Sequence, residues 1–131
     1  FSLLRYQFLK ELQATKQYIV KHLGKGFISP SQALFAAPIL FVRKPNRGLR
    51  FCIDFRKLNL LTRKDRYPLP LLDEILARMS RAKVFTKLDI RQAFYRIRIH
   101  PDSEDLTTFR TRYGTYKCKV LLFRLTNKLA T

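Results

Sequence analysis

The sequence predicts a fold of the α+β class. Short runs of β-forming residues mix with helical periodicities, and no strand–helix–strand rhythm runs through the 131 residues. Hydrophobic residues make up 47% of the chain, which permits a packed core and excludes a disordered tail. The 27 Lys and Arg against 9 Asp and Glu give a formal net charge of +18. Because 11 Phe and 6 Tyr are interleaved with these cations, nucleic acid is the favoured partner, and a merely basic surface of ribosomal type is the alternative.

A helix and a basic hairpin are expected in the first half. Residues 1–23 carry apolar side chains at helical spacing, and Gly24 supplies a stop. A loop is expected around residues 29–31. Two β-forming runs, 38–43 and 49–55, flank a turn cluster and predict a hairpin. The cations at its tip are Arg43, Lys44, Arg47 and Arg50.

The second half is expected to hold a short helix, two further strands and a closing hairpin. The helix follows two prolines, and its apolar stripe, which we expect in the core, is Leu72, Ile75, Leu76 and Met79. Residues 84–89 predict a strand that ends on an acid, and residues 96–100 alternate between apolar and basic side chains. The final hairpin pairs residues 107–113 with 115–122 around Gly114.

The cysteines and the apolar runs bear on location. Cys52 and Cys118 have neither a disulfide framework nor a metal-binding spacing, so free thiols in a reducing compartment are predicted. The longest apolar run, residues 33–42, is too short to span a membrane. Residues 1–10 lack the layout of a signal peptide. We therefore expect an intracellular protein that is not secreted and has no membrane partner.

Six stretches follow one another in a set order between residues 25 and 114. They are KGFISPS (25–31), APILFV (37–42), LRFCIDFRKLN (49–59), RYPLP (66–70), FTKLDIRQ (85–92) and FRTRYG (109–114). Together they resemble the reverse transcriptases of gypsy-type LTR retrotransposons. The resemblance implies a truncated right-hand polymerase fold, with fingers at residues 1–64, the first part of the palm at 65–98 and a return to the fingers at 99–131. It also implies a cytoplasmic retroelement particle or the nucleus as the location.

Asp89 carries the catalytic expectation. Nucleotidyl transfer depends on positioning and on charge neutralisation by two divalent ions, and Mg²⁺ prefers carboxylate oxygens. From the residues alone, Asp89 is better explained as a solvated acid that ends a strand. The resemblance reverses this interpretation: it makes Asp89 a catalytic metal ligand, with the backbone carbonyl of Ile90 facing the same two Mg²⁺ ions.

Five residues match the nucleotide-binding pattern of the family, and one of them is Ile90 beside Asp89. Arg50 and Lys44 match two cations of the fingers that contact the triphosphate, for which a solvated hairpin tip is the alternative. Phe94 matches the aromatic gate beneath the sugar, which selects deoxynucleotides; the alternative is a core aromatic. Phe123 falls within the stretch that forms part of the family's nucleotide pocket.

The resemblance also implies template contacts and partners. Asp54 and Arg56 match a pair near the template strand, and an exposed ion pair worth under ~1 kcal/mol is the alternative. The implied partners are an RNA or DNA template with its primer, dNTPs, and the remaining palm, thumb and RNase H regions.

The last stretch departs from the family pattern Met-Pro-Phe-Gly-Leu-Thr-Asn-Ala-Pro-Ala-Thr. Leu122 and Leu129 replace its prolines, Arg124 replaces its glycine and Lys128 its first alanine. The second acidic motif, Tyr-x-Asp-Asp, is expected beyond Thr131, so the chain by itself is not expected to polymerise. The predicted function is that of a reverse transcriptase fragment of a retrotransposon polyprotein, which adds dNTPs to a primer when complete. The alternatives are a non-catalytic basic nucleic-acid-binding module and a decayed relic.

Overall fold

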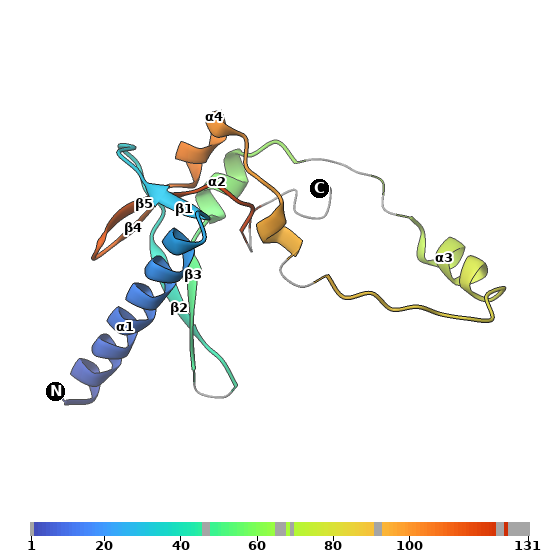
Figure 1. Ribbon diagram of the computed structural model, residues 1–131, viewed down its shortest axis with the longest axis horizontal. Coiled ribbons are helices and arrows are strands. Elements are labelled where there is room, and N and C mark those ends of the chain that lie inside the picture. Colours follow the sequence, from blue (N-terminus) through green and yellow to red (C-terminus); the bar gives the residue numbers. More distant parts are fainter. Residues whose placement is uncertain are drawn as a thin grey trace.

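The fold is known from a computed structural model that describes residues 2–45, 48–64, 68, 70–90, 93–122 and 125, with side chains from Phe8 onward. Helices and strands are mixed, as the predicted α+β class requires (Figure 1). The elements are α1 (Ser2–Gly24), β1 (Ile28–Pro30), β2 (Ile39–Arg43), β3 (Leu49–Ile53), α2 (Arg56–Leu61), α3 (Leu72–Met79), the 3-10 helix η1 (Ala93–Arg96), α4 (Pro101–Glu104), the 3-10 helix η2 (Asp105–Thr107), β4 (Phe109–Thr111) and β5 (Gly114–Cys118).

The predicted N-terminal helix is confirmed, but its buried stripe differs from the apolar spacing. Among the residues of α1 from Phe8 onward, Thr15, Ile19 and His22 are buried, whereas Phe8 and Leu23 are exposed. The stripe is therefore part polar, and its polar groups are satisfied locally: Thr15 Oγ1 donates to the carbonyl of Glu11 at 2.8 Å. Two residues after the end of α1, Gly26 is left-handed (φ 68°), a conformation that favours a residue without a Cβ, and its N–H donates to the carbonyl of Leu23 at 2.9 Å.

The strands of the described part of the chain form two antiparallel sheets. The predicted hairpin is confirmed as β2–β3, with Ile39 opposite Ile53 and Arg43 opposite Leu49. The closing hairpin is confirmed as β4–β5, although both of its strands are shorter than predicted. The sheet order is β1-β5-β4.

β1 corrects the loop expected at residues 29–31. Ser29 and Pro30 pair with Lys117 and Tyr116, because the inner strand β5 offers a second row of backbone groups to pair. Pro30 is tolerated there, since β1 is an edge strand and Pro30 ends it. The proline and the polar residues around it had suggested a loop, but pairing with β5 outweighs that local preference.

One core joins α1 to both sheets. Phe55, Phe109 and Cys118 are at most 2% exposed, with Ile28 and Ile53 beside them. The two sheets are connected through Ala37, whose N–H donates to the carbonyl of Thr108 at 2.7 Å and whose carbonyl accepts from the N–H of Arg110 at 3.1 Å. Cys52 and Cys118 are free and buried, which confirms the predicted free thiols. Burial raises the pKa of Cys118 to about 12, so its thiol is protonated and unreactive at neutral pH.

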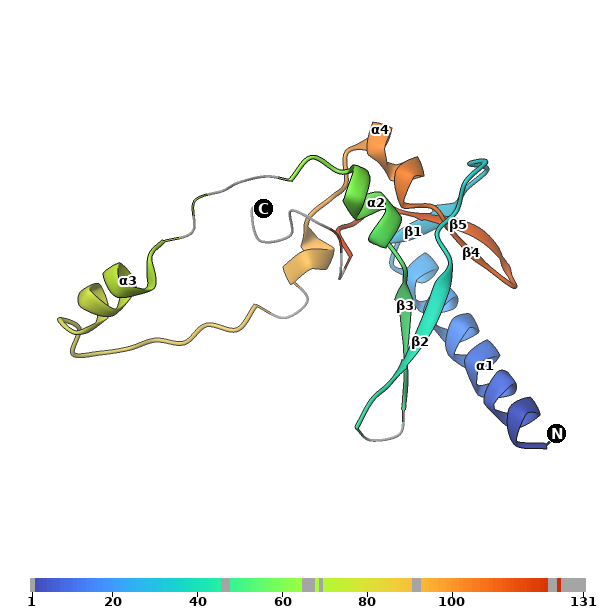
Figure 2. The same cartoon turned by 180° about the vertical axis from the view of Figure 1, so that it is seen from behind.

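The predicted core role of α3 is wrong for the chain as it stands. Helix α3 and the residues that follow it lie apart from the remaining elements (Figures 1 and 2). Its apolar stripe is exposed, with Leu72 at 68% and Leu76 at 54%. The predicted strand at residues 84–89 is also wrong: this segment is extended, exposed and without regular pairing. A β-forming sequence becomes a strand only where a neighbour pairs its backbone groups.

Residues 93–107 also differ from expectation. The strand predicted at 96–100 is reduced to a bridge between Arg98 and Val120, and it follows the η1 turn. The short helices α2 and α4 were not predicted. In α4, Pro101 occupies the first turn, where its missing N–H costs nothing. None of the helices in the described part of the chain is long and apolar enough to span a lipid bilayer.

Candidate functional site

A cavity of about 630 Å³ lies between α1 and the β2–β3 hairpin, a volume typical of small-molecule sites. Three of the predicted nucleotide-binding residues line it: Lys44 and Arg50 from the hairpin, and Phe94 from η1. Phe94 lies 44 positions after Arg50 in the sequence, and the fold brings it to the same cavity as the two hairpin cations. Leu122, which departs from the family pattern, is buried at 4% exposure and also lines it.

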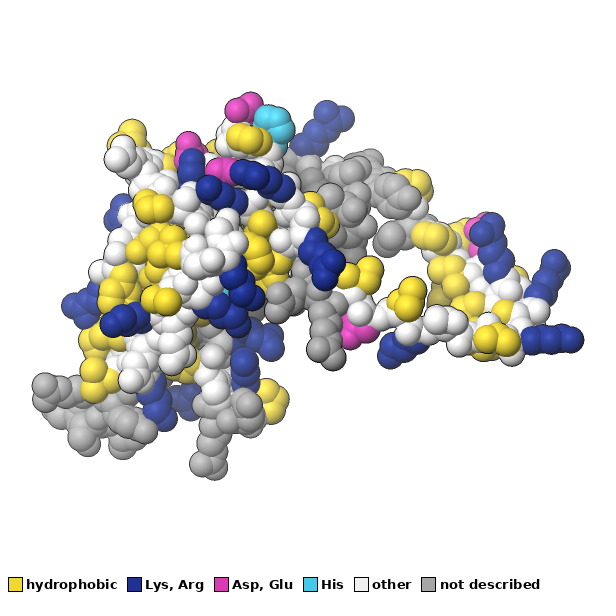
Figure 3. Space-filling view, viewed as in Figure 1, with side chains coloured by type: hydrophobic (Ala, Val, Ile, Leu, Met, Phe, Trp, Pro, Cys, Tyr) yellow, Lys and Arg dark blue, Asp and Glu magenta, His cyan; other side chains and the backbone are white. Residues whose placement is uncertain are grey.

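The cavity is positively charged. Its lining contains the cations Lys21, Lys44 and Arg50, and no carboxylate is among the lining residues that the structure describes. Within the described ranges, no Asp or Glu lies within 4.0 Å of these three cations, so no ion pair compensates them there. Lys and Arg side chains are visible over α1 and the hairpin, and several of the acidic side chains lie near α4 (Figure 3). The cavity therefore favours an anionic ligand.

Stacked aromatic rings form the wall between α1 and the hairpin. The ring of Tyr18 lies 3.9 Å from that of His22 and 4.1 Å from that of Phe51, both stacked, and the ring of Tyr95 is 5.7 Å from His22. Burial raises the pKa of Tyr18 and also that of Tyr95, which is less deeply buried. Both phenols therefore stay protonated. The cavity thus combines flat apolar surfaces with cations, as a nucleotide site requires.

His22 is buried in this wall at 6% exposure. Burial lowers its pKa below the usual 6.5, and the charges of Lys21 and Lys25 act in the same direction. A hydrogen bond of 2.8 Å between Nδ1 and the carbonyl of Tyr18 opposes the shift but does not outweigh it. His22 is therefore neutral at physiological pH.

We expect the free energy of unfolding to fall on acidification through the His22 transition. In the unfolded chain His22 has a pKa near 6.5 and takes up a proton below that pH, whereas in the folded chain it stays neutral. Its contribution to stability is therefore complete above pH 6.5 and is lost as the pH falls toward the lowered pKa of the folded state. Urea unfolding between about pH 7.5 and 5.5 measures this loss. His22→Phe, which keeps the stacked ring, should reduce the loss, and the exposed His100→Phe is the matched control. An unchanged loss in His22→Phe would contradict this assignment.

Asp54 and Arg56 are brought together, as the predicted pair requires. Arg56 Nη2 lies 2.7 Å from Asp54 Oδ2, and Nε lies 2.9 Å from Oδ1. The backbone N–H of Arg56 also donates to Asp54 Oδ1 at 3.1 Å, so this carboxylate holds the first turn of α2. The Arg56 side chain is 85% exposed, which makes the geometry that of a surface ion pair.

Asp89 and Ile90 do not line the cavity. Both are exposed, in the extended segment between α3 and η1. Across the described ranges, no three His, Cys, Asp or Glu side chains come close enough to hold a metal ion. One carboxylate and one backbone carbonyl supply only part of the two-magnesium site expected of the complete enzyme, which needs further carboxylates. Phe123, Arg124, Lys128 and Leu129 lie outside the described residues.

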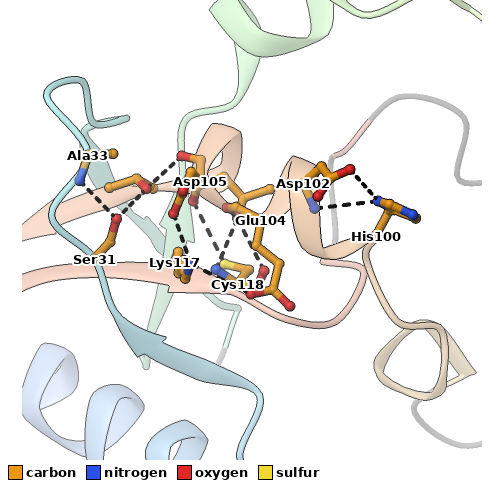
Figure 4. Close-up of polar contacts among 10 residues, drawn as sticks. Ser31, Ala33, His100, Asp102, Glu104, Asp105, Lys117 and Cys118 are labelled. Atoms are coloured by element: carbon orange, nitrogen blue, oxygen red, sulfur yellow. Dashed lines mark hydrogen bonds and ion pairs between the residues drawn. The ribbon is translucent and has the colours of Figure 1, made fainter.

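Away from the cavity, a polar cluster fixes α4 and η2 to β5 (Figure 4). Lys117 Nζ lies 2.9 Å from Asp105 Oδ1 and 3.8 Å from the buried Glu104, and Thr107 Oγ1 accepts from the backbone N–H of Cys118 at 2.9 Å. These contacts satisfy the buried polar groups, which assigns the cluster to structure. Sequence reasoning did not identify it, and it also missed Tyr18, Lys21 and His22 in the cavity. The only available signal for the cavity residues was their helical spacing with Ala14 and Gln17.

The fold is that of part of a reverse transcriptase domain. Residues 42–129 match the family model described as reverse transcriptase (RNA-dependent DNA polymerase). The chain belongs to this family, and the predicted reverse-transcriptase resemblance is confirmed.

Two relatives of known sequence support the assignment. An RNA-directed DNA polymerase homolog of Oenothera berteroana is 46% identical over 84 residues, which is 64% of this chain and 59% of that protein. The transposon Tf2-3 polyprotein of Schizosaccharomyces pombe (strain 972 / ATCC 24843) is 34% identical over 111 residues, 85% of this chain and 8% of the polyprotein. The chain thus spans about three fifths of the plant relative and a small part of the transposon polyprotein.

Solved structures agree on the fold. A prototype foamy virus protease–reverse transcriptase superposes with a TM-score of 0.73 at 26% identity, over 87% of this chain and 15% of the viral one. A foamy viral protease–reverse transcriptase in complex with dsDNA gives a TM-score of 0.71 at 20% identity, over 90% of this chain and 25% of the other. The predicted right-hand polymerase fold, present in part, is confirmed.

Proposed function

We propose that this chain is part of the RNA-directed DNA polymerase of a gypsy-type retrotransposon, which adds dNTPs to a primer when the rest of the polymerase is present. The observation that carries the proposal is the cavity that gathers Lys44, Arg50 and Phe94. The 34% identity to the Tf2-3 polyprotein supports a retrotransposon origin. The gypsy type itself rests on the sequence motifs.

The subdomain division follows the proposed function. We assign residues 1–64 and 99–131 to the fingers and residues 65–98 to the first part of the palm. In support, α1, β1–β3, β4 and β5 share one core, whereas α3 and residues 80–90 lie apart from it. The mutual burial of the two fingers segments is what a single subdomain requires, since sequence-distant segments must cover a common apolar surface.

Within the cavity, the three gathered residues take different roles. The guanidinium of Arg50 can meet two phosphate oxygens at once, whereas the ammonium of Lys44 acts as a point charge. Phe94 is half-buried, and its ring would fill the space that a 2′-hydroxyl needs. A dNTP thus meets cations at its phosphates and a ring at its sugar.

Binding of dTTP to the 131-residue chain tests the proposal. Arg50→Gln removes a charge from the cavity and should weaken binding about tenfold, the effect of losing a hydrogen bond to a charged group. Arg110→Gln, on the exposed face of β4 and outside the cavity, is the matched control and should change binding less than twofold. Isothermal titration calorimetry measures both. Equal affinities of the two variants would contradict a nucleotide site at Arg50.

The remaining partners are a primer with its RNA or DNA template, and the rest of the palm, thumb and RNase H regions. The formal charge of +18 supports nucleic acid, and the structure of a foamy viral relative was solved with dsDNA. We assign Asp54 and Arg56 to the template side and Phe123 to the nucleotide side. The free, buried thiols support an intracellular location, in a cytoplasmic retroelement particle or the nucleus.

Magnesium is the proposed cofactor of the complete enzyme. It would supply charge neutralisation at the phosphates, with Asp89 and the carbonyl of Ile90 among its ligands. Further carboxylates are needed, because the described part of the chain gathers none around Asp89.

A non-catalytic nucleic-acid-binding module is the second candidate. The observation that favours it is the departure of Leu122 from the family's proline, in a residue that lines the cavity. Primer extension by a completed polymerase separates the two candidates.

A further inference from the structure

The wall of the cavity that faces the hairpin belongs to α1, which matches none of the motifs that suggested a nucleotide site. Gln17 and Lys21 lie four residues apart, so they share one face of the helix, and both line the cavity. Lys44 and Arg50 reach the same cavity from β2–β3. Cations therefore approach the cavity from two sides.

We propose that Lys21 of α1 is a third phosphate-binding residue, which contacts a nucleoside triphosphate from the side opposite to Arg50 and Lys44. The inference rests on the proposed function, because it uses the same cavity and the same ligand class. It extends the site from the hairpin and η1 to helix α1.

Three observations support this role. Lys21 is exposed and lines the cavity, so its ammonium is accessible to a ligand. No carboxylate in the described part of the chain lies within 4.0 Å of it. None of the acidic residues that the structure describes lines the cavity, so a polyanion would meet attraction from both of these walls.

A simpler role for Lys21 is to offset the partial negative charge at the end of α1, since it lies in the last turn of the helix. That role concerns helix stability and makes no demand on the hairpin across the cavity. The two roles are separable, because a helix-dipole contribution changes the free energy of unfolding, whereas a phosphate contact changes ligand affinity.

His22, next to Lys21, provides a local probe. It is buried in the cavity wall, and the groups that face it are Lys21 and Lys25, the Tyr18 carbonyl, and the rings of Tyr18, Phe27 and Tyr95. A polyanion beside Lys21 would offset the two lysine charges and raise the pKa of His22. The chain has only two histidines, and His100 is exposed at the start of α4, outside the cavity.

The experiment compares Lys21→Gln with Lys16→Gln and Arg50→Gln in the full 131-residue chain. Lys16 is an exposed residue of the same helix that does not line the cavity, so Lys16→Gln makes the same charge change without touching the site. Calorimetry with inorganic tripolyphosphate, dTTP and a short single-stranded oligo(dT) at one ionic strength gives the affinities. We expect Lys21→Gln to weaken tripolyphosphate and dTTP about three- to tenfold, and Lys16→Gln less than twofold.

Proton NMR gives the second readout. Tripolyphosphate should move the His22 imidazole signal and raise the pKa of His22, and leave the His100 signal in place. The His22 response should be smaller in Lys21→Gln than in Lys16→Gln.

The outcomes separate this inference from the proposed function. If Arg50→Gln weakens dTTP binding and Lys21→Gln matches Lys16→Gln, the role of Lys21 is overturned and the nucleotide site remains. If Lys21→Gln weakens only the oligonucleotide, the lysine contacts a nucleic-acid strand, which also overturns the proposal. If dTTP does not bind, or no variant differs from Lys16→Gln, both the inference and the nucleotide site fall.

Discussion

Replacing Phe109 with alanine should lower the free energy of unfolding by about 3–5 kcal/mol, the usual cost of deleting a fully buried phenylalanine ring. Phe109 is 0% exposed and starts β4. Its ring lies 6.1 Å from that of Phe51 in β3, 6.5 Å from Tyr18 in α1 and 6.0 Å from Tyr116 in β5. The cavity left behind would therefore open at the junction of the helix and both sheets, where no single element can move to fill it.

Urea unfolding followed by circular dichroism measures this loss, and Phe85→Ala is the matched control. Phe85 loses the same ring, but it is 64% exposed in the extended segment after α3, so its removal should change stability by less than about 0.5 kcal/mol. A comparable loss in both variants would show that Phe85 is packed in solution. That result would contradict the separate position of this segment.

The elements that the sequence predicted correctly are those whose local signal and tertiary contacts agree. The β2–β3 hairpin has two β-forming runs on either side of a turn, and its strands pair with each other, so no distant partner is needed. Helix α1 was predicted from spacing alone, yet its buried face includes Thr15 and His22. Hydropathy does not reveal that these polar groups are satisfied within the helix.

The elements that sequence reasoning missed depend on distant partners. β1 is a strand because β5 pairs with it: Ile28 lies opposite Cys118, which is 90 positions further along the chain. Conversely, residues 84–89 have strand-forming composition but remain exposed. Propensity is a weak guide where pairing decides the outcome.

The candidate site was predictable only in part, for the same reason. The motifs identified Lys44, Arg50 and Phe94, and the fold brings these three to one cavity. Lys21 and His22 could not be found by motif, because they enter the cavity through the packing of α1 on the hairpin. Asp89 was identified by its motif, but the metal site predicted around it needs carboxylates that the described part of the chain does not place there.

Asp89→Asn should abolish primer extension by a completed polymerase. In that enzyme the chain is joined to a palm that supplies the Tyr-x-Asp-Asp motif, and Leu122, Arg124, Lys128 and Leu129 are returned to the family residues. Asparagine keeps the size of the side chain and one oxygen but removes the charge that attracts magnesium. Asp89 is exposed in the 131-residue chain, so the same substitution there should change the free energy of unfolding by less than about 0.5 kcal/mol. Loss of activity with unchanged stability would assign the effect to catalysis.

Phe94→Ala in the same polymerase is the contrasting variant. It should retain extension and admit ribonucleotides, because the proposed task of the ring is to fill the space that a 2′-hydroxyl needs. Single-nucleotide extension with dNTP and rNTP side by side reads out both variants. A completed polymerase that does not extend primers would favour the non-catalytic binding module. If the parent is active and Asp89→Asn extends primers equally well, Asp89 is not a metal ligand, and the catalytic part of the proposed function is wrong.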